Sequence, residues 1–225
     1  MTRWLGWFTL FAMVVLFQGT ATAQTVGRTE IKDLPEGWTQ LVAYDKNGLV
    51  LDGGQDNIPL KGGAFLNRAL GMLMVVESST AGHGRPISWV TMKCPAARVD
   101  YFTNDYGSNQ SNRNTRCLVI NTRYASKTYI AEISPPAGQA LEKEGLRFDT
   151  GQMVRAWSGI RGGSYLKIYL LKTTDFNVGP ASEKDEFSKV PKTLIAFGES
   201  MQQLVYDATL SLGGNLSLQL LNSIK

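Results

Sequence analysis

Two cysteines are the residues of this 225-residue sequence whose type and spacing most directly suggest specific chemistry. Cys94 and Cys117 flank an asparagine-rich stretch, residues 104–114. Their spacing is not the C-x-x-C of thioredoxin-like redox sites. A zinc site would need further Cys or His ligands, and the chain has a single histidine, His83. We therefore predict a structural disulfide between Cys94 and Cys117, with free buried thiols and a catalytic cysteine as the alternatives.

A stretch without acidic residues, from Tyr106 to Ala131, is the second candidate site. A basic loop that leads into a strand can bind an anionic polymer, and the alternative is a solvated strand face. The net charge of the chain is only +4, so nucleic acid is not expected as a partner. The pattern predicts an anionic polymer or an envelope protein as partner. The candidate anion-binding residues are Arg113, Arg116, Arg123 and Lys127.

Two further patterns are weak candidates for catalysis. His83 lies between two glycines, where we expect a solvated loop histidine. Ser164 and Lys167 fit the S-x-x-K spacing of penicillin-binding enzymes. However, they lie in an alternating segment that we expect to be a strand, where residues three apart face opposite sides. The sequence therefore predicts no catalytic residue, no metal site and no cofactor.

The N-terminus has the layout of a secretory signal peptide. Arg3 precedes an apolar run from Leu5 to Phe17, which is shorter than the roughly 20 residues that a membrane-spanning helix needs. The sequence ATAQ then places an A-x-A pattern before Gln24. An uncleaved anchor is the alternative. We expect residues 1–23 to be removed, leaving no transmembrane segment in a protein of the periplasm, the outer membrane or the exterior.

Residues 24–173 are expected to form a β-rich domain. Asn47-Gly48 separates two apolar runs and predicts a hairpin turn. Residues 135–145 predict a short helix, since proline suits its first turn and Gly145 can end it. The predicted fold is mainly β, of the α+β type: an antiparallel β meander that forms a sandwich or a partly open barrel. Further strands are expected at residues 70–78, 87–94, 98–102, 117–124, 127–134, 153–160 and 164–172.

The last part of the chain is expected to hold a helix and a possible β-hairpin. Residues 174–191 are polar and interrupted by prolines, as in a linker. Within residues 192–225, apolar residues first recur at helical spacing. Leucines then alternate with polar residues on either side of a Gly-Gly-Asn turn. This alternation predicts a hairpin over residues 208–221, with a continued, broken helix as the alternative.

Part of the chain resembles a known family. Residues 38–107 contain DKNGLVLD, VVES and GRPISWVTMKCPAARVDYF in this order. In these segments the chain resembles the surface-adhesin E-like group of small exported bacterial proteins. The resemblance implies an envelope or surface protein that binds host or envelope macromolecules without catalysis, and it carries over no individual functional residue.

Two functional hypotheses follow from these observations. The first is an exported, non-enzymatic envelope protein that acts by surface binding or as an accessory subunit of an envelope assembly. The second is an envelope hydrolase whose site is built from residues distant in sequence. The two differ in the feature they require, because an enzyme needs a concave pocket with convergent titratable groups. A binding protein needs an exposed patch, an open strand edge or a basic face.

We predict that the exported protein begins at Gln24. Signal peptidases require small residues before the cleavage site, so Ala23→Leu should leave the uncleaved precursor. Cell fractionation followed by intact-mass measurement tests both statements. Finding the full-length wild-type chain in the cytoplasm would contradict the prediction of export.

Overall fold

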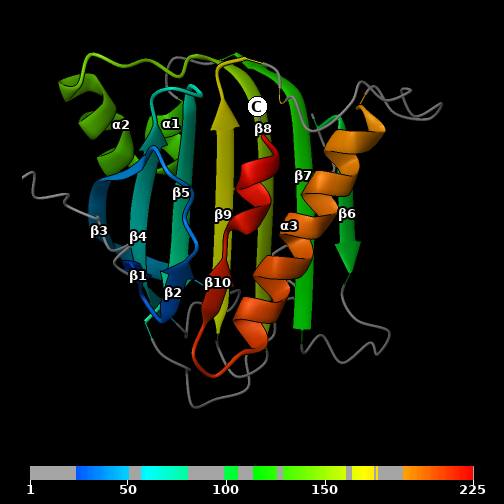
Figure 1. Ribbon diagram of the computed structural model, residues 1–225. Coiled ribbons are helices and arrows are strands. Elements are labelled where there is room, and N and C mark those ends of the chain that lie inside the picture. The colour runs from blue at the N-terminus through cyan, green and yellow to red at the C-terminus, as the bar shows by residue number, and fades with distance from the viewer. Residues whose placement is uncertain are drawn as a thin grey trace, which may run out of the picture.

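The protein is built on a seven-stranded antiparallel sheet (Figure 1). The computed structural model describes residues 24–50, 57–80, 99–105, 114–125, 129–160, 164–174, 176 and 190–224. In pairing order the strands are β3 (Trp38–Val50), β4 (Asn57–Asn67), β5 (Met72–Ser79), β9 (Tyr165–Lys172), β8 (Thr150–Ile160), β7 (Asn114–Ala125) and β6 (Tyr101–Asp105). Two meanders, β3-β4-β5 and β6-β7-β8-β9, are therefore joined where β5 pairs with β9.

A small second sheet and a long helix cover one face of the large sheet (Figure 1). The small sheet has the order β1-β2-β10, and its strands are β1 (Gln24–Val26), β2 (Thr29–Lys32) and β10 (Asn215–Ser217). The helix α3 (Lys192–Leu210) packs on β7, β8 and β9. The prediction of a mainly β fold with a C-terminal helix is confirmed, and the arrangement is sandwich-like, not a closed barrel.

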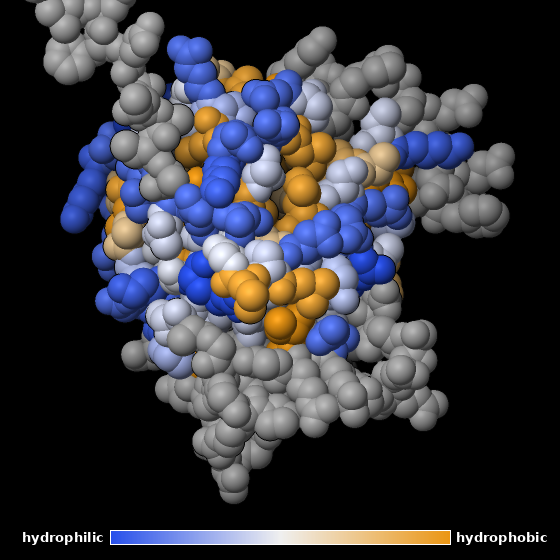
Figure 2. All heavy atoms as spheres, turned by 60° about the horizontal axis from the view of Figure 1, so that its bottom comes forward, coloured by the Kyte–Doolittle hydropathy of each residue, from blue (hydrophilic) through white to orange (hydrophobic). Residues whose placement is uncertain are grey.

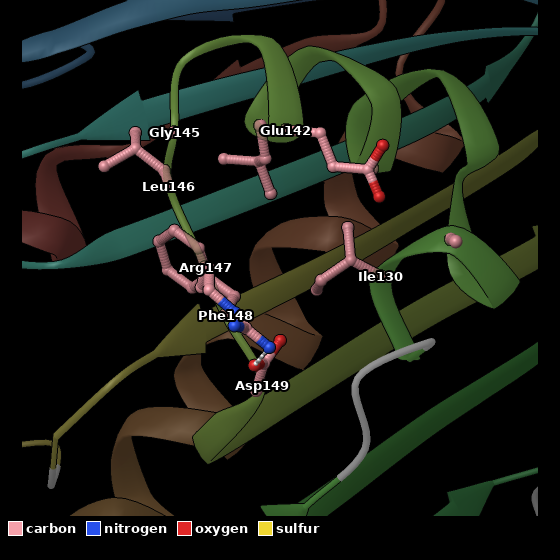
Figure 3. A pocket seen from close by; sticks show the side chains of 10 residues that line it. Ile130, Glu142, Gly145, Leu146, Arg147, Phe148 and Asp149 are labelled. Carbon is pink, nitrogen blue, oxygen red and sulfur yellow. Dashed lines mark ion pairs between the residues drawn. The ribbon is translucent and has the colours of Figure 1, made fainter.

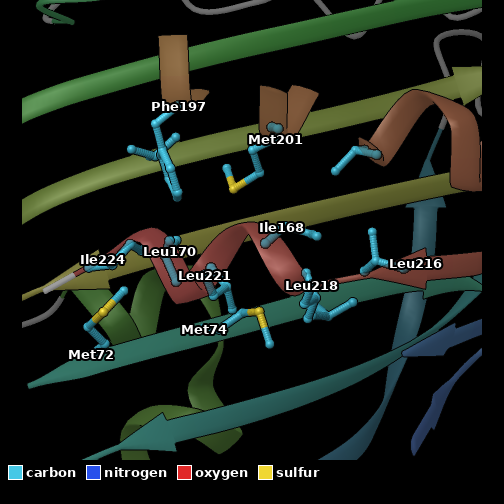
Figure 4. Packing of buried hydrophobic residues seen from close by; sticks show 14 of the residues in the cluster. Met72, Met74, Ile168, Leu170, Phe197, Met201, Leu216, Leu218, Leu221 and Ile224 are labelled. Carbon is cyan, nitrogen blue, oxygen red and sulfur yellow. The ribbon is translucent and has the colours of Figure 1, made fainter. Parts of the chain in front are cut away.

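The main hydrophobic core lies between α3, the small sheet and the large sheet. Alternate residues of β9, namely Leu166, Ile168 and Leu170, point into it. Phe197 and Met201 reach it from α3. Figure 4 shows that the segment after α3 also contributes, including the 3₁₀ helix η1 (Gln219–Ser223). The C-terminal residues and the β-rich part of the chain therefore share one core.

The opposite face of the sheet is covered at one end by two short helices, α1 (Tyr129–Ile133) and α2 (Pro135–Lys143). Their apolar side chains join those of β4, β5, β8 and β9 in a second cluster. The side chain of Ser134 accepts a hydrogen bond from the Ala137 backbone N–H and so caps α2. Gly145 has a φ of +67°, which ends the helix and turns the chain back toward the sheet. The predicted helix at residues 135–145 is confirmed.

The hairpin turn predicted at Asn47-Gly48 is wrong. β3 runs through both residues, and the connection to β4 comes after Val50. The pairing shifts by one residue here, since Lys46 lies opposite Leu60 whereas Leu49 lies opposite Ile58. The dipeptide thus lies where the extra residue of a β-bulge is inserted.

The strand predicted at residues 127–134 is also wrong, because the described part of this segment forms α1. Ile130 is buried in the second cluster, and Tyr129 and Ile133 pack against it. These positions have helical spacing, so one face of a short helix covers the sheet. β-Branched and aromatic residues favour strands in general, but contact with the sheet decides the conformation here. Another expected strand, residues 87–94, lies outside the described residues.

Residues 208–221 form neither the predicted hairpin nor a continued helix. α3 continues to Leu210, because Val205, Ala208 and Thr209 are buried on its inner side. After a turn, β10 pairs in parallel with β2, so the segment contributes one strand and not two. Leu218 then leads into η1. β10 thus pairs with the edge of β2, where the predicted hairpin would have had its own second strand.

The turn after α3 is held in place although its leucine side chain is exposed. The Arg28 guanidinium Nη2 donates hydrogen bonds to the backbone oxygens of Ser211, at 2.6 Å, and Leu212, at 3.2 Å. The side chain of Leu212 is nonetheless fully exposed, and that of Leu210 is also exposed. Figure 2 shows apolar side chains gathered among hydrophilic ones at this end of the molecule. None of the described helices is long and apolar enough to cross a membrane.

Packing of α3 on β7 depends on the absence of a side chain at Gly198. A Cβ atom there would lie 3.0 Å from Leu118 Cδ1 and 3.1 Å from Ile120 Cδ1. We predict that Gly198→Leu lowers the free energy of unfolding by about 1–3 kcal/mol, because it overpacks this contact. Gly198→Ala should be nearly neutral, since a gain in helix propensity of about 1 kcal/mol offsets the tighter contact.

Urea unfolding curves of the purified variants measure this difference. Ala196→Leu is the matched control, because Ala196 is an exposed residue of the same helix. Equal stability of Gly198→Leu and Ala196→Leu would contradict the close approach of α3 to β7.

Candidate functional site

A pocket of about 420 Å³ lies between α1, α2 and the segment that leads into β8 (Figure 3). Its volume falls within the range of small-ligand sites, roughly 300–1,000 Å³. The residues that line it are Ile130, Ala131, Gly138, Leu141, Glu142, Gly145, Leu146, Arg147, Phe148 and Asp149.

Two glycines determine the shape of this pocket. Gly138 lets α2 approach α1, since a Cβ at this position would lie 3.2 Å from the Ala131 Cα. Gly145 reverses the chain after α2, and the Leu146 N–H then donates to the Leu141 carbonyl over 2.9 Å. The following residues, up to Asp149, consequently run back along the pocket and form its second wall (Figure 3).

The pocket has an apolar floor and a charged rim. Ile130, Leu141 and Phe148 are buried and form the floor. Arg147 Nη2 lies 2.5 Å from Asp149 Oδ2, an ion pair drawn as a dashed line in Figure 3. Glu142 adds an exposed carboxylate, so the rim carries one more acidic than basic group. Such a pocket suits an apolar group with polar or cationic surroundings, such as a side chain of a protein.

A row of charged and aromatic residues crosses the same face of the sheet. Cross-strand pairing places Tyr44, Gly62, Glu77, Lys167 and Trp157 side by side on β3, β4, β5, β9 and β8. Residues that lie directly opposite each other on neighbouring strands share a face. Charged groups from distant parts of the chain therefore meet on the inner strands of the sheet.

Glu77 is the most deeply buried charged group of this row, with 1% of its side chain exposed. Lys46 Nζ lies 2.6 Å from Glu77 Oε1, and the Tyr44 hydroxyl donates to the same oxygen over 3.4 Å. Burial and the Glu77 carboxylate raise the pKa of Tyr44 well above its usual value, so this hydroxyl keeps its proton. Glu77 is thus bound by one cation and one hydroxyl.

Lys167, directly opposite Glu77, has a different environment. Its Nζ lies 4.6 Å from the centre of the Tyr169 ring. Burial lowers the pKa of Lys167 to about 7; the Glu77 carboxylate opposes this change, and Arg155 and Lys46 add to it. The amine is consequently close to half protonated at neutral pH.

Arg155 of β8 lies in the next row, opposite Tyr169. Its Cζ is 5.9 Å from the centre of the Tyr169 ring. The side chain is partly exposed, but its Nε is buried and has no hydrogen-bond partner. Tyr44, Glu77, Lys46, Lys167, Arg155 and Tyr169 are called the charged cluster below.

The structure describes only some of the residues predicted to be functional. Cys117 is buried in β7 and is not a free thiol. Its predicted partner Cys94 lies outside the described residues, so the bridge between them stays a prediction. The candidate histidine, His83, also lies outside them. Within the described part of the chain, no group of His, Cys, Asp or Glu side chains has the arrangement of a metal site.

The predicted anion-binding residues are only partly brought together. Arg116 Nη1 donates to Gln203 Oε1 over 2.9 Å, and its Cζ lies 5.1 Å from the centre of the Tyr206 ring, so this side chain packs on α3. Arg123 is exposed near the end of β7. The remaining two candidates, at positions 113 and 127, lie outside the described residues.

The charged cluster was not identified from the sequence. One signal was present, because the alternation in residues 164–172 places Lys167 and Tyr169 on the face opposite to Leu166 and Leu170. The partners Glu77, Lys46 and Arg155 are 90, 121 and 12 positions away, and only strand pairing brings them together. The pocket gave no sequence signal, since it depends on the approach of α1 to α2.

No protein-family model, no curated protein and no solved structure matches this chain.

Lys167 should make stability depend on pH. Its pKa is about 7 in the folded protein and near the ordinary 10.5 when unfolded, so the unfolded state binds more protons between these values. Stability should therefore rise with pH from about 7 to 9.5, by roughly 1–3 kcal/mol. Above that range stability should fall again. Burial raises the pKa of Tyr44 and Tyr169 in the folded protein, so these hydroxyls lose their protons first in the unfolded state.

Denaturant unfolding at several pH values measures this effect. Lys167→Met should remove the rise, whereas Lys61→Met, which removes an exposed lysine on β4, should keep it. A rise of equal size in wild type and Lys167→Met would assign the pH dependence to other groups.

Proposed function

We propose that this chain is an exported, non-enzymatic protein of the cell envelope that acts by binding a partner protein, as an accessory subunit of an envelope assembly. The observation that carries the proposal is the pocket between α1 and α2. Its apolar floor can take up a side chain of a partner, and its charged rim can form polar contacts around that side chain.

Features of the sequence support this proposal. The signal-peptide layout of residues 1–23 and the predicted disulfide agree with a protein of an oxidising compartment. The resemblance of residues 38–107 to the surface-adhesin E-like group also favours a binding protein. An excess of acidic groups on the rim makes a protein a better partner for this pocket than an anionic polymer.

An anionic polymer remains the partner proposed for a different surface. Arg123 is exposed, and Arg116 holds its guanidinium against Tyr206 on α3. These two residues are the described part of the basic surface predicted from the sequence. Salt-sensitive binding would be expected there, since contacts between exposed charges are screened by salt.

The second candidate function is an envelope hydrolase, and Lys167 is the observation that favours it. An amine with a pKa near 7 can act as a general base. However, among the described residues no hydroxyl is hydrogen-bonded to this amine. Ser164 is three positions away, a spacing that in an extended chain leads to the opposite face. Turnover that Lys167→Met abolishes without loss of folding would favour the hydrolase.

Photo-crosslinking from inside the pocket tests the binding proposal. Ala131 lines the pocket and is exposed, so a benzoylphenylalanine at this position faces an incoming partner without disturbing the core. Gln139 of α2 is exposed but does not line the pocket, and it is the matched control. Irradiation of native cells should give a defined protein adduct at position 131 and none at position 139.

The partner found in this way then allows a binding measurement. Ala131→Trp fills the pocket and should weaken binding at least tenfold, about 1.4 kcal/mol, whereas Gln139→Trp should leave it unchanged. Adducts of the same kind at both positions, or adducts to polysaccharide alone, would overturn the proposal of a protein partner in this pocket.

A further inference from the structure

The charged cluster holds more positive than negative charge. Lys46, Lys167 and Arg155 contribute three cations, and Glu77 contributes the carboxylate. Lys46 Nζ forms an ion pair with that carboxylate, at 2.6 Å from Glu77 Oε1. Within the described part of the chain, no carboxylate lies within ion-pair distance of Lys167 or Arg155. The cluster therefore has two basic groups whose charge the protein itself does not neutralise by contact.

One hydrogen-bond donor of the cluster is buried without an acceptor. The Arg155 Nε–H has no hydrogen-bond partner, although buried N–H groups are nearly always paired. Arginine binds planar oxyanions through Nε and a terminal nitrogen together, which is the geometry that a carboxylate matches. An oxyanion at the partly exposed Arg155 side chain would neutralise the guanidinium, and a small shift of this side chain toward the surface would bring its Nε–H to the bound oxygen as well.

The basic side chains of the cluster are accessible from the surface. Lys46, Lys167 and Arg155 are each partly exposed, whereas Glu77 is buried beneath them. Tyr44 occupies the space above Gly62, where a Cβ would lie only 2.0 Å from the Tyr44 ring. The glycine thus lets the tyrosine ring lie over β4 and bring its hydroxyl to Glu77. An anion can therefore reach Lys167 and Arg155 without displacing the buried carboxylate.

We propose that Lys167 and Arg155 form a binding site for an oxyanion group, either a carboxylate or a tetrahedral anion such as sulfate, on the sheet face opposite α3. The Lys46–Glu77 ion pair lies beside this site, and Lys167 and Arg155 both lie over the Tyr169 ring. This site is separate from the pocket between α1 and α2, so the inference does not depend on the proposed function.

Binding at this site is expected to take up a proton. A bound anion favours the charged form of Lys167, which is only half populated in the free protein near pH 7. Burial raises the pKa of the surrounding tyrosines, so they stay neutral up to pH 8 and do not contribute. In the part of the chain that the structure describes, the titratable or charged groups around Lys167 and its neighbours Arg155 and Tyr169 are Tyr44 and Lys46 of β3, Glu77 of β5, Tyr165 of β9 and Tyr129 of α1.

Isothermal titration calorimetry at low ionic strength tests the site. Sulfate and malonate are suitable probes, because one is tetrahedral, the other has planar carboxylates, and the charge of sulfate is constant between pH 6 and 8. We expect saturable binding of at least one of them, with an affinity that falls about tenfold from pH 6 to pH 8 as Lys167 loses its proton. The heat measured in buffers of different ionisation enthalpy should show proton uptake.

Substitutions separate a binding role from a structural one. Lys167→Met and Arg155→Gln should each weaken binding at least tenfold, and Lys61→Met on the other face of the sheet should not. Lys167→Arg should retain binding but lose its pH dependence, because arginine keeps its charge throughout this range. Far-UV circular dichroism confirms that each variant is folded.

Two results would overturn the inference. The first is that the wild-type protein binds neither sulfate nor malonate at 10 mM, a concentration of the order expected for very weak anion sites. The second is equal weakening by Lys167→Met and Lys61→Met, which would assign binding to the net charge of the protein. Ala131→Trp, which tests the pocket, should leave anion binding unchanged, so the two proposals fail independently.

Discussion

The pairing of β5 with β9 is the contact on which the other parts of the fold depend. It joins two meanders that are separate in sequence and makes one sheet from them. All side chains of β5 are buried, so its apolar residues stabilise both faces of the sheet at once. Closing the long loop between β5 and β9 costs conformational entropy. Burial of apolar side chains on both faces of β5 offsets this cost.

This pairing also sets the register that separates the two faces. Leu166, Ile168 and Leu170 enter the hydrophobic core under α3. Lys167 and Tyr169, the residues between them, go to the other face. A shift of one residue would exchange these two sets. The apolar core under α3 therefore fixes the position of the charged cluster on the opposite side.

Both proposed sites lie on the face that α1 and α2 cover only at one end. The helices pack over the row that contains Leu171 and Met153. At that end they enclose the pocket, and one and two rows further along they leave Arg155 and Lys167 partly exposed. Burial of Glu77 is costly unless it is paired, so Lys46 and Tyr44 are needed to keep the carboxylate on this face.

The sequence by itself determined the features that depend on local patterns. Short apolar segments between turn signals predicted β5 and β8, alternation predicted β9, helical spacing predicted α3, and the Pro and Gly signals predicted α2, because each of these patterns is local. The alternation of residues 164–172 also placed Lys167 opposite the leucines. Local signals failed at Asn47-Gly48, at α1 and after Leu210, where a bulge, a contact with the sheet and the edge of β2 decided the conformation.

Only the tertiary structure decided which residues meet. Glu77, Lys46, Arg155 and Lys167 come from four strands, and no local pattern in the sequence links them. The pocket likewise depends on the distance between α1 and α2, which Gly138 permits but does not specify. Local conformation follows from short-range spacing, whereas a site made by distant residues follows from strand order and register, which long-range packing selects.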